Sequence, residues 1–288
     1  MPLFRRLSDD RLDEPVLIVG LEGWIDAGFA AGGALAALLS SISTEVLASF
    51  DADELIDYRA RRPVVHITDG IDTSINWQTI QLRAGKDRNG KDVCFLVGPE
   101  PDMRWQAFAA DVVAISLDLG VRLAVGLGGF PAPVPHTRPV RLAATGGSAE
   151  IAHRIGFVQG TIEVPAGIGA VLEMGLAAAG ITSVGLWARV PHYIATAPFP
   201  PASAALVEGL AEITDLAIDS TELRTAADSA IQRVDDLISR SKEHIAMVRQ
   251  LEERLDSSEG NPLHMRQMPT GDEIASELEK YLRGNDQA

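Results

Sequence analysis

The sequence has 288 residues, of which 46% are hydrophobic, and its formal net charge at pH 7 is −15. This length suits one large α/β domain or one domain with a helical appendage. The acidic balance argues against a nucleic-acid partner, because phosphate binding needs a basic stripe on the surface. No apolar run reaches the ~18 residues of a membrane span, and charges stand where a signal peptide needs an apolar core. We therefore expect a cytoplasmic protein that binds neither nucleic acid nor a membrane.

The first part of the chain alternates apolar runs with a helical pattern. Continuous apolar runs between turn residues are typical of strands buried on both faces. Asp26 is placed to cap the first helix, and Asn89-Gly90 is the turn signal of a hairpin. The predicted elements are a strand at 15–20, a helix at 26–41, a strand at 45–50, a hairpin of strands 75–82 and 93–97, and a helix at 103–119.

The same alternation continues further along the chain. The predicted elements are strands at 121–127 and 140–144, a helix at 167–179, a strand at 181–190 and a helix at 201–218. This order predicts an α/β fold with a largely parallel central sheet, and the hairpin makes its pairing mixed. Between two of these strands, residues 127–140 contain four prolines. They stiffen a loop that is suited to hold a partner or a ligand, since a prefolded loop costs less to order on binding.

Residues 221–256 differ from the rest of the chain. They contain no Gly or Pro, and their apolar groups follow a 4-3 spacing that is interrupted at Ser241 and His244. This pattern predicts one amphipathic helix of ~50 Å. The interruptions argue against a long dimeric coiled coil.

A second, short helix is expected near the end of the sequence, from Thr270 or Asp272 to about Leu282. We therefore divide the chain into an α/β body, residues 1–220, and a helical appendage, residues 221–288. An exposed apolar stripe usually marks an interface, so we expect the appendage to fold back on its own body or on a neighbour's.

Polar side chains gather after four of the predicted strands. Loops that follow neighbouring parallel strands open at the same edge of the sheet, so we expect these side chains to share one cleft. The alternative is structural: Asp26 and Asp102 cap helices, Trp24 and Trp105 pack, and Arg138 pairs with a carboxylate. The candidates for a cleft or a contact surface are Glu22, Trp24, Asp26, Glu100, Asp102, Arg104, Trp105, His136, Arg138, His192 and Tyr193.

No standard catalytic motif is complete. Residues 145–150 lack the second glycine of a nucleophile elbow, and residues 126–129 lack the lysine of a phosphate loop. The six histidines show no metal-ligand spacing, so we expect no metal and no cofactor. Cys94 lies in an apolar run and is interpreted as inert core, and Glu173 as ordinary helix filling.

Five segments between residues 15 and 218 stand out together: GWIDAG (23–28), FLVGPEPDMRW (95–105), LGGFPAPVPHTRP (127–139), VPAGIGAVLEM (164–174) and LWARVPHY (186–193). In these segments the chain resembles the proteasome assembly chaperone 2-like family, and within it the actinobacterial branch. The resemblance implies a three-layer α/β/α domain similar to the nucleoside phosphorylase fold. It also implies self-association, for which we expect a homo-oligomer and in the first place a trimer.

Better-known relatives in this family help to build the α ring of the proteasome and reach it with a carboxyl-terminal hydrophobic-Tyr-X tail. In this sequence the last tyrosine, Tyr281, stands seven residues before the final residue. We therefore do not expect docking on the proteasome through such a tail.

Two functions stay open at this point. The first is a non-catalytic, chaperone-like or scaffolding protein that acts through protein–protein contacts. The second is a small-molecule enzyme or binder in which His136 is the acid/base and Arg138 holds an anion. The absence of a complete catalytic motif favours the first. The cleft of the second would consist of Glu22, Trp24, Glu100, Arg104, His136 and Arg138.

Overall fold

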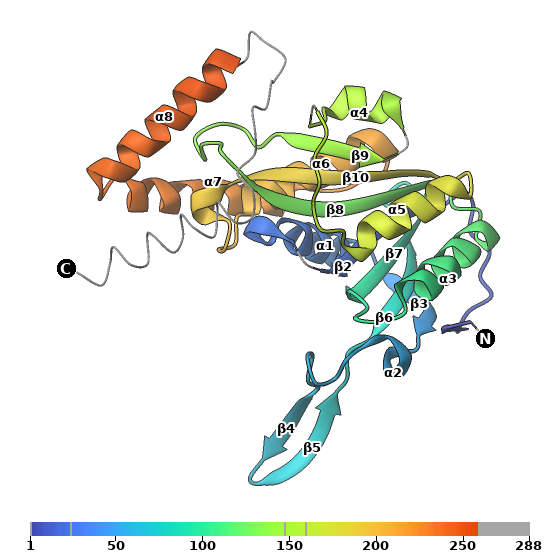
Figure 1. The fold of residues 1–288 in the computed structure, drawn as a ribbon. Helices are drawn as coiled ribbons and strands as arrows, with labels where there is room; N and C mark the ends of the chain where they lie inside the picture. The colour runs from blue at the N-terminus through green and yellow to red at the C-terminus, as the bar shows by residue number, and fades with distance from the viewer. Residues whose placement is uncertain (1, 24, 147, 159, 259–288) are drawn as a thin grey trace.

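In the computed structural model, which describes residues 2–23, 25–146, 148–158 and 160–258, an eight-stranded mixed sheet lies between helices (Figure 1). The order of its strands is β1-β3-β6-β7-β2-β8-β10-β9. These strands are β1 (Phe4–Arg6), β2 (Val16–Glu22), β3 (Thr44–Phe50), β6 (Ile80–Lys86), β7 (Asp92–Pro99), β8 (Leu123–Ala132), β9 (Leu142–Gly146) and β10 (Thr182–Pro191).

The centre of the sheet is parallel. Strands β7, β2, β8 and β10 run in the same direction, whereas the outer strands pair antiparallel. Val16 at the start of β2 lies between Val93 of β7 and Leu123 of β8, and all three side chains are buried. Apolar runs fit here because both faces of these strands are covered. The carboxyl ends of the four strands therefore meet at one edge.

Helices cover both faces and complete three layers, as expected. Helices α1 and α6 pack together on one face, and α3 and α5 on the other. Neighbouring residues of β2 alternate between the two cores: Leu17 faces α3 and α5, and Ile18 faces α1 and α6. The helices of the body are α1 (Ala30–Ser41), α2 (Ala52–Leu55), α3 (Trp105–Asp118), α4 (Ala149–Ile155), α5 (Ile168–Ala178) and α6 (Pro200–Thr214), with 3-10 turns η1 (Ala27–Phe29) and η2 (His192–Ile194).

Two predicted boundaries are wrong. The first helix begins at Ala30 and not at Asp26, because Gly28 and Phe29 adopt left-handed φ angles of 66° and 50° that no α-helix accommodates. The hairpin strand expected at 75–82 begins at Ile80. Residues 75–76 belong to a different hairpin, which the sequence interpretation did not foresee.

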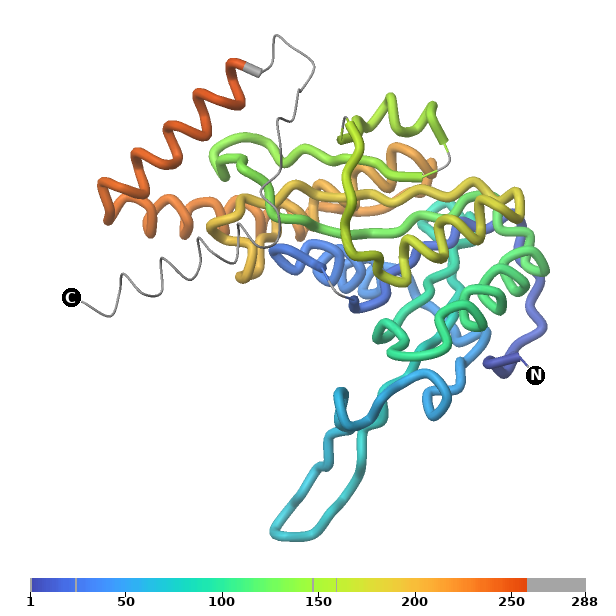
Figure 2. Tube along the Cα trace, in the orientation of Figure 1, coloured from blue at the N-terminus to red at the C-terminus, as the bar shows by residue number. Residues whose placement is uncertain are grey.

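This further hairpin, here called the arm, consists of β4 (Val64–Thr68) and β5 (Ile71–Asn76) and extends away from the sheet (Figure 2). Its turn residues are Asp69 and Gly70, with φ angles of 51° and 82°. An Asp-Gly pair with two positive φ angles is typical of a tight hairpin turn. Every residue of both strands is exposed.

The single long helix expected over 221–256 is also wrong, because two helices are formed, α7 (Thr221–Ile238) and α8 (Lys242–Ser258). The chain turns at residues 239–241, where Ser239 Oγ donates to the carbonyl of Asp236 at 2.8 Å. Ser241 Oγ accepts from the backbone N–H of His244 at 3.4 Å, as a helix-capping serine does.

The turn lets both helices lie against the body. Ala227 and Ala230 of α7 and Val248 and Leu251 of α8 are buried, and α7 packs beside α6. The expectation that the appendage folds back is therefore confirmed for residues 221–258, on its own body. The short helix expected from about residue 270 lies outside the described residues.

Candidate functional site

The polar candidates follow β2, β7, β8 and β10, whose carboxyl ends lie at one edge of the sheet. The structure divides them into three groups with different partners. Trp24 lies outside the described residues, so its part in a shared cleft stays a prediction.

The first group surrounds the amino ends of two helices. Asp26 accepts from the backbone N–H groups of Ala31 and Gly32 at 2.8 and 2.9 Å, so it caps α1 from five and six residues away. Glu22 is exposed at the end of β2, and its carbonyl accepts from the N–H of Glu100 at 2.8 Å. The capping role of Asp26 that the sequence suggested is therefore correct, although the helix begins later.

Glu100 caps a helix that is distant in sequence. Its side chain is buried, and Oε1 accepts from the backbone N–H of Ile168, at the start of α5, at 2.5 Å. Carboxylates are favoured at this end of a helix, where N–H groups are unpaired and the helix dipole is positive. A Cβ atom at Gly23 or Gly167 would come within 3.3 Å of this carboxylate, so glycine at both positions leaves it room.

The second group holds the base of the arm. Asp102 accepts from the N–H of Asp57 at 2.8 Å and from Arg61 Nε at 3.2 Å. Arg104 forms an ion pair with Glu54 on α2. Next to them, Trp105 Nε1 donates to the carbonyl of Pro101 at 2.5 Å, and its ring packs on the core. Asp102 and Arg104 thus fasten residues 54–61, which lead into the arm.

The third group joins the proline-rich loop to the appendage. His136 is buried; its Nδ1 lies 2.7 Å from the Tyr193 hydroxyl and its Nε2 lies 2.9 Å from Asp235 Oδ1 on α7. An ionised carboxylate only accepts, so the proton of a neutral imidazole is on Nε2 and the tyrosine donates to Nδ1. Burial raises the pKa of Tyr193 to about 12, which keeps the hydroxyl protonated. His192 is exposed and meets the Tyr193 ring edge-on.

Helix α8 is held by the same loop. Arg138 donates to Asp256 through Nε and an Nη atom, at 3.1 and 2.8 Å, and to Glu252 at 3.2 Å. The hydrogen bonds from Arg138 lower the pKa of Asp256. The Thr137 hydroxyl donates to the same Glu252 at 2.5 Å. The stiff loop is therefore a platform on which α7 and α8 of the same chain dock.

Two further polar features lie at β10, of which Glu173 was interpreted from the sequence as ordinary helix filling and the second was not singled out. Glu173 of α5 accepts from Thr145 Oγ1 at 3.0 Å, and Thr145 accepts from Trp187 Nε1 at 3.1 Å. Burial raises the pKa of Glu173, which lies within helix α5 as the sequence predicted. Arg141 and Arg189 are the second feature. The sequence did contain a pattern that could have identified Arg189. Along residues 182–191, Trp187 and Arg189 alternate with the buried Ala188 and Val190, so they share the other face of the strand.

Across the described parts of the chain, no group of three or more His, Cys, Asp or Glu side chains is arranged to hold a metal ion. None of the described helices combines the length and the apolar character that crossing a membrane requires. Cys94 is buried in the core as expected, and burial raises its pKa to about 12.

Residues 20–238 match the PAC2 family. The chain belongs to this family. The proteasome assembly chaperone-like family inferred from the sequence is therefore confirmed. A comparison of this PAC2 chain with curated proteins finds no match.

Solved structures agree with the assignment to PAC2. A Corynebacterium glutamicum protein of unknown function is 31% identical with a TM-score of 0.83, over 89% of this chain and 97% of that one. A Mycobacterium tuberculosis protein of unknown function is 33% identical with a TM-score of 0.82, over 88% and 89% of the two chains. A Mycobacterium tuberculosis proteasome-assembly chaperone homologue is 32% identical with a TM-score of 0.75, over 81% and 99%.

Proposed function

We propose that this PAC2 protein is a non-catalytic, chaperone-like or scaffolding protein of the cytoplasm that acts through protein–protein contacts, first of all with copies of itself. The solved relative named as a proteasome-assembly chaperone homologue supports a chaperone-like role. The fold alone decides nothing about function, so the argument rests on surfaces of this chain.

The observation that carries the proposal is the arm. A two-stranded hairpin is at best marginally stable by itself in water, and large exposed apolar patches mark contact surfaces. The arm nevertheless extends from the body with both strands exposed. The large apolar side chains exposed on it are Val64, Val65, Ile67, Ile71 and Ile75.

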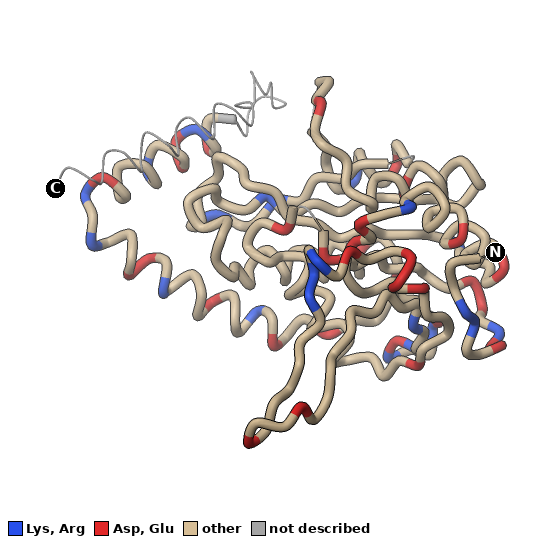
Figure 3. The backbone as a smooth tube through the Cα atoms, turned by 60° about the horizontal axis from the view of Figure 1, so that its bottom comes forward, with Lys and Arg blue, Asp and Glu red and all other residues tan. Residues whose placement is uncertain are grey.

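Charge favours an acidic partner, and another copy of the chain is acidic. Arg59, Arg61 and Arg62 precede β4, and basic positions gather where the arm joins the body (Figure 3). The chain as a whole carries a formal net charge of −15. Arg61 is paired with Asp102, so Arg59 and Arg62 are the basic residues next to the arm that suit contact with the acidic surface of a second copy.

A second exposed apolar set supports a ring. Phe157, Ile162 and Val164 precede α5, and Met174 lies on α5; all four are exposed. Contact between two different patches is head-to-tail, and such contacts close into a ring when the rotation between copies permits. Such a ring is a homo-oligomer, and we propose for it the trimer expected from the family resemblance.

The small-molecule alternative has less support. Of the residues that would line its cleft, Glu100 bonds to the start of α5, and Arg104 pairs with α2. His136 and Arg138 bond to the appendage. A general acid/base or an anion-binding arginine must be within reach of a substrate, whereas these four are engaged by the chain itself.

Hydrogen exchange measured at increasing protein concentration tests the proposal. The amides of residues 64–76 should exchange more slowly over about a hundredfold rise in concentration, because association stabilises the bound form by mass action. The amides of the central strand β2 serve as the control and should not respond. Arm amides whose exchange is fast and independent of concentration would contradict the proposal.

A further inference from the structure

The arm has two outer edges, and its two strands differ in how these edges are built. β4 and β5 form a sheet of their own, and no other strand of the described residues lies beside it. Between Ser74 and Asp72 of β5, which pair with consecutive residues of β4, Thr73 forms a bulge. A bulge and a charged side chain such as Asp72 protect an edge from pairing with another chain. β4 contains no bulge, no proline and no Asp, Glu, Lys or Arg, so its edge is unprotected.

The outer edge of β4 presents the backbone groups of Val65 and Ile67. In a hairpin with a two-residue turn, the residue before the turn, here Thr68, directs its backbone groups at the other strand. Backbone groups point alternately toward and away from the neighbouring strand, so those of His66 also face β5. The carbonyl of His66 agrees with this, because it accepts from Thr73 Oγ1 of β5 at 3.0 Å. The N–H and C=O groups of Val65 and Ile67 therefore point outward, where another strand can pair with them.

The side chains of β4 make this edge complementary to itself. Val65 and Ile67 lie on one face of the arm, because side chains alternate along a strand, and His66 between them lies on the other. When two copies of β4 pair antiparallel with His66 opposite His66, Val65 of each copy lies opposite Ile67 of the other. Apolar side chains then meet on the same face, and each such pair exchanges its outward N–H and C=O groups. The contact brings no formal charges together, although each chain carries a net charge of −15.

We propose that β4 pairs antiparallel with β4 of a second copy, about a two-fold axis at His66, and joins two arms into one continuous sheet. This rests on the proposed function, contact between copies through the arm, and names the edge and the geometry of one such contact. Main-chain hydrogen bonds supply the binding, as they do wherever a strand is added to a free sheet edge. A two-fold contact is closed and joins copies in pairs. The ring uses the apolar face of the arm, so edge pairing joins copies of two rings.

A cysteine placed at the axis tests the pairing in the full-length protein. In the proposed contact His66 lies opposite its own copy in a non-hydrogen-bonded pair, whose Cα atoms are ~4.5 Å apart. This distance lies within the range of about 4.4–6.8 Å that a disulfide spans. Oxidised glutathione should therefore convert His66→Cys into a disulfide-linked dimer, which non-reducing electrophoresis detects. The protein's own cysteine, Cys94, is buried and should form no such dimer in the wild type.

Ser74→Cys is the matched control. Ser74 lies opposite His66 on β5 and is exposed as His66 is. In the proposed sheet the two copies of Ser74 are three strand spacings apart, ~14 Å, which no disulfide spans, so this variant should form about tenfold less dimer than His66→Cys or worse.

A second variant, Val65→Pro, separates the edge from the apolar face. Proline keeps an apolar side chain but lacks the N–H group, and the N–H of Val65 points away from β5, so the hairpin keeps its own hydrogen bonds. Val65→Pro combined with His66→Cys should form as little dimer as Ser74→Cys. Equal dimer yields of His66→Cys and Ser74→Cys, or a yield that Val65→Pro leaves unchanged, would overturn the edge pairing. Arm amides that still exchange more slowly at high protein concentration would then leave the proposed function standing, whereas amides that do not respond would overturn both.

Discussion

His136 Nε2 lies 2.9 Å from Asp235 Oδ1, and this contact joins the proline-rich loop after β8 to the first helix of the appendage. The imidazole is buried, whereas the carboxylate is half exposed. The loop is held in turn by the Tyr193 hydroxyl, which accepts from the backbone N–H of His136 at 2.8 Å. A rigid loop suits this task, because little order is lost when the helix docks on it.

Removing this carboxylate should loosen α7. The Asp235→Ala variant leaves a buried imidazole N–H without an acceptor, which costs about 1–2 kcal/mol. Hydrogen exchange of the amides of residues 221–238 should accelerate accordingly, while β2 stays protected. Asp236→Ala on the same helix is the matched control and should change little. Equal exchange in the two variants would show that the contact does not hold α7.

The ion pairs of Arg138 should make the docking of α8 sensitive to salt. The pair with Asp256 is partly exposed, and exposed pairs contribute about 0.2–1 kcal/mol and weaken as salt is added. In Arg138→Gln, exchange at residues 242–258 should be faster at low salt and should depend less on salt than in the wild type. Arg249→Gln is the control, because it removes the same charge from α8 itself and should keep the salt dependence of the wild type. If both variants keep the wild-type salt dependence, Arg138 does not anchor α8.

Loss of the Glu100 cap should destabilise the body. Glu100→Ala leaves the N–H of Ile168 without its acceptor, and losing a helix cap costs about 0.5–2 kcal/mol. Denaturant unfolding should detect this change. Glu22→Ala is the control, because Glu22 is exposed at the neighbouring strand end and should cost under about 0.5 kcal/mol. Equal stability of the two variants would mean that Glu100 does not act as a cap.

The central sheet was predictable because its strands are apolar throughout. The continuous apolar runs at 16–19 and 93–97 predict strands that are buried on both faces. Burial on both faces in turn requires helices above and below the sheet. The break between α7 and α8 was not predictable in the same way. No Gly or Pro marks residues 239–241. Serine can also stand inside a helix, so it ends one only where contacts with the body stabilise the turn.

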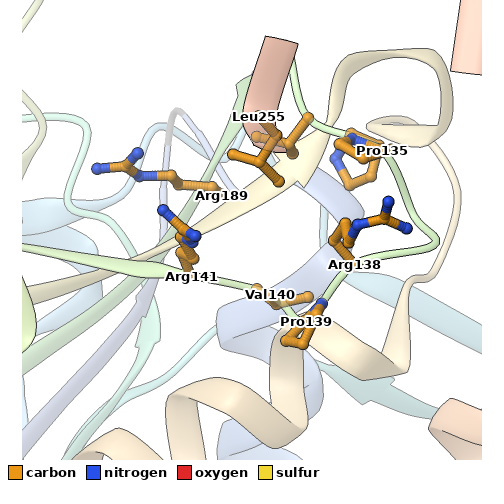
Figure 4. Close-up of a pocket in the computed structure, with 9 residues that line it drawn as sticks. Pro135, Arg138, Pro139, Val140, Arg141, Arg189 and Leu255 are labelled. Carbon is orange, nitrogen blue, oxygen red and sulfur yellow. The ribbon is translucent and has the colours of Figure 1, made fainter. Parts of the chain in front are cut away.

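The arm was missed although Asp69-Gly70 gave a turn signal, because its apolar residues have no core to face. The candidates around the sheet edge could be named from the sequence, but their partners could not. Arg138 depends on carboxylates more than a hundred residues later, on a helix whose start the sequence did not reveal. Arg189 was not identified from the sequence for a similar reason. The residue beside it, Arg141 (Figure 4), is set by the pairing of β10 with β9, which the sequence did not reveal.

Glu173 should make stability depend on pH. Burial raises its pKa above the ordinary glutamate value, so the folded state holds a proton that the unfolded state releases. The contribution of the protonated Glu173 to the free energy of unfolding is complete below the pKa of an unfolded glutamate, about 4.3. It is lost as the pH rises through the higher pKa of the folded state. Glu173→Gln should therefore raise the unfolding midpoint at pH 7.5 relative to wild type. The difference should shrink toward pH 4, and a constant difference at all pH values would argue against the raised pKa.

The mass of the protein in solution, measured by light scattering after size exclusion, tests the central claim of contact between copies through the arm. The wild type should have a mass that is a multiple of the 30.7 kDa chain. The double variant Ile67→Asp/Ile71→Asp should have the mass of one chain, because it places charges in the apolar contact. Ser74→Asp, which puts one charge on the same arm, should keep the wild-type mass. A wild type at 30.7 kDa, or a double variant that stays oligomeric, would contradict the account.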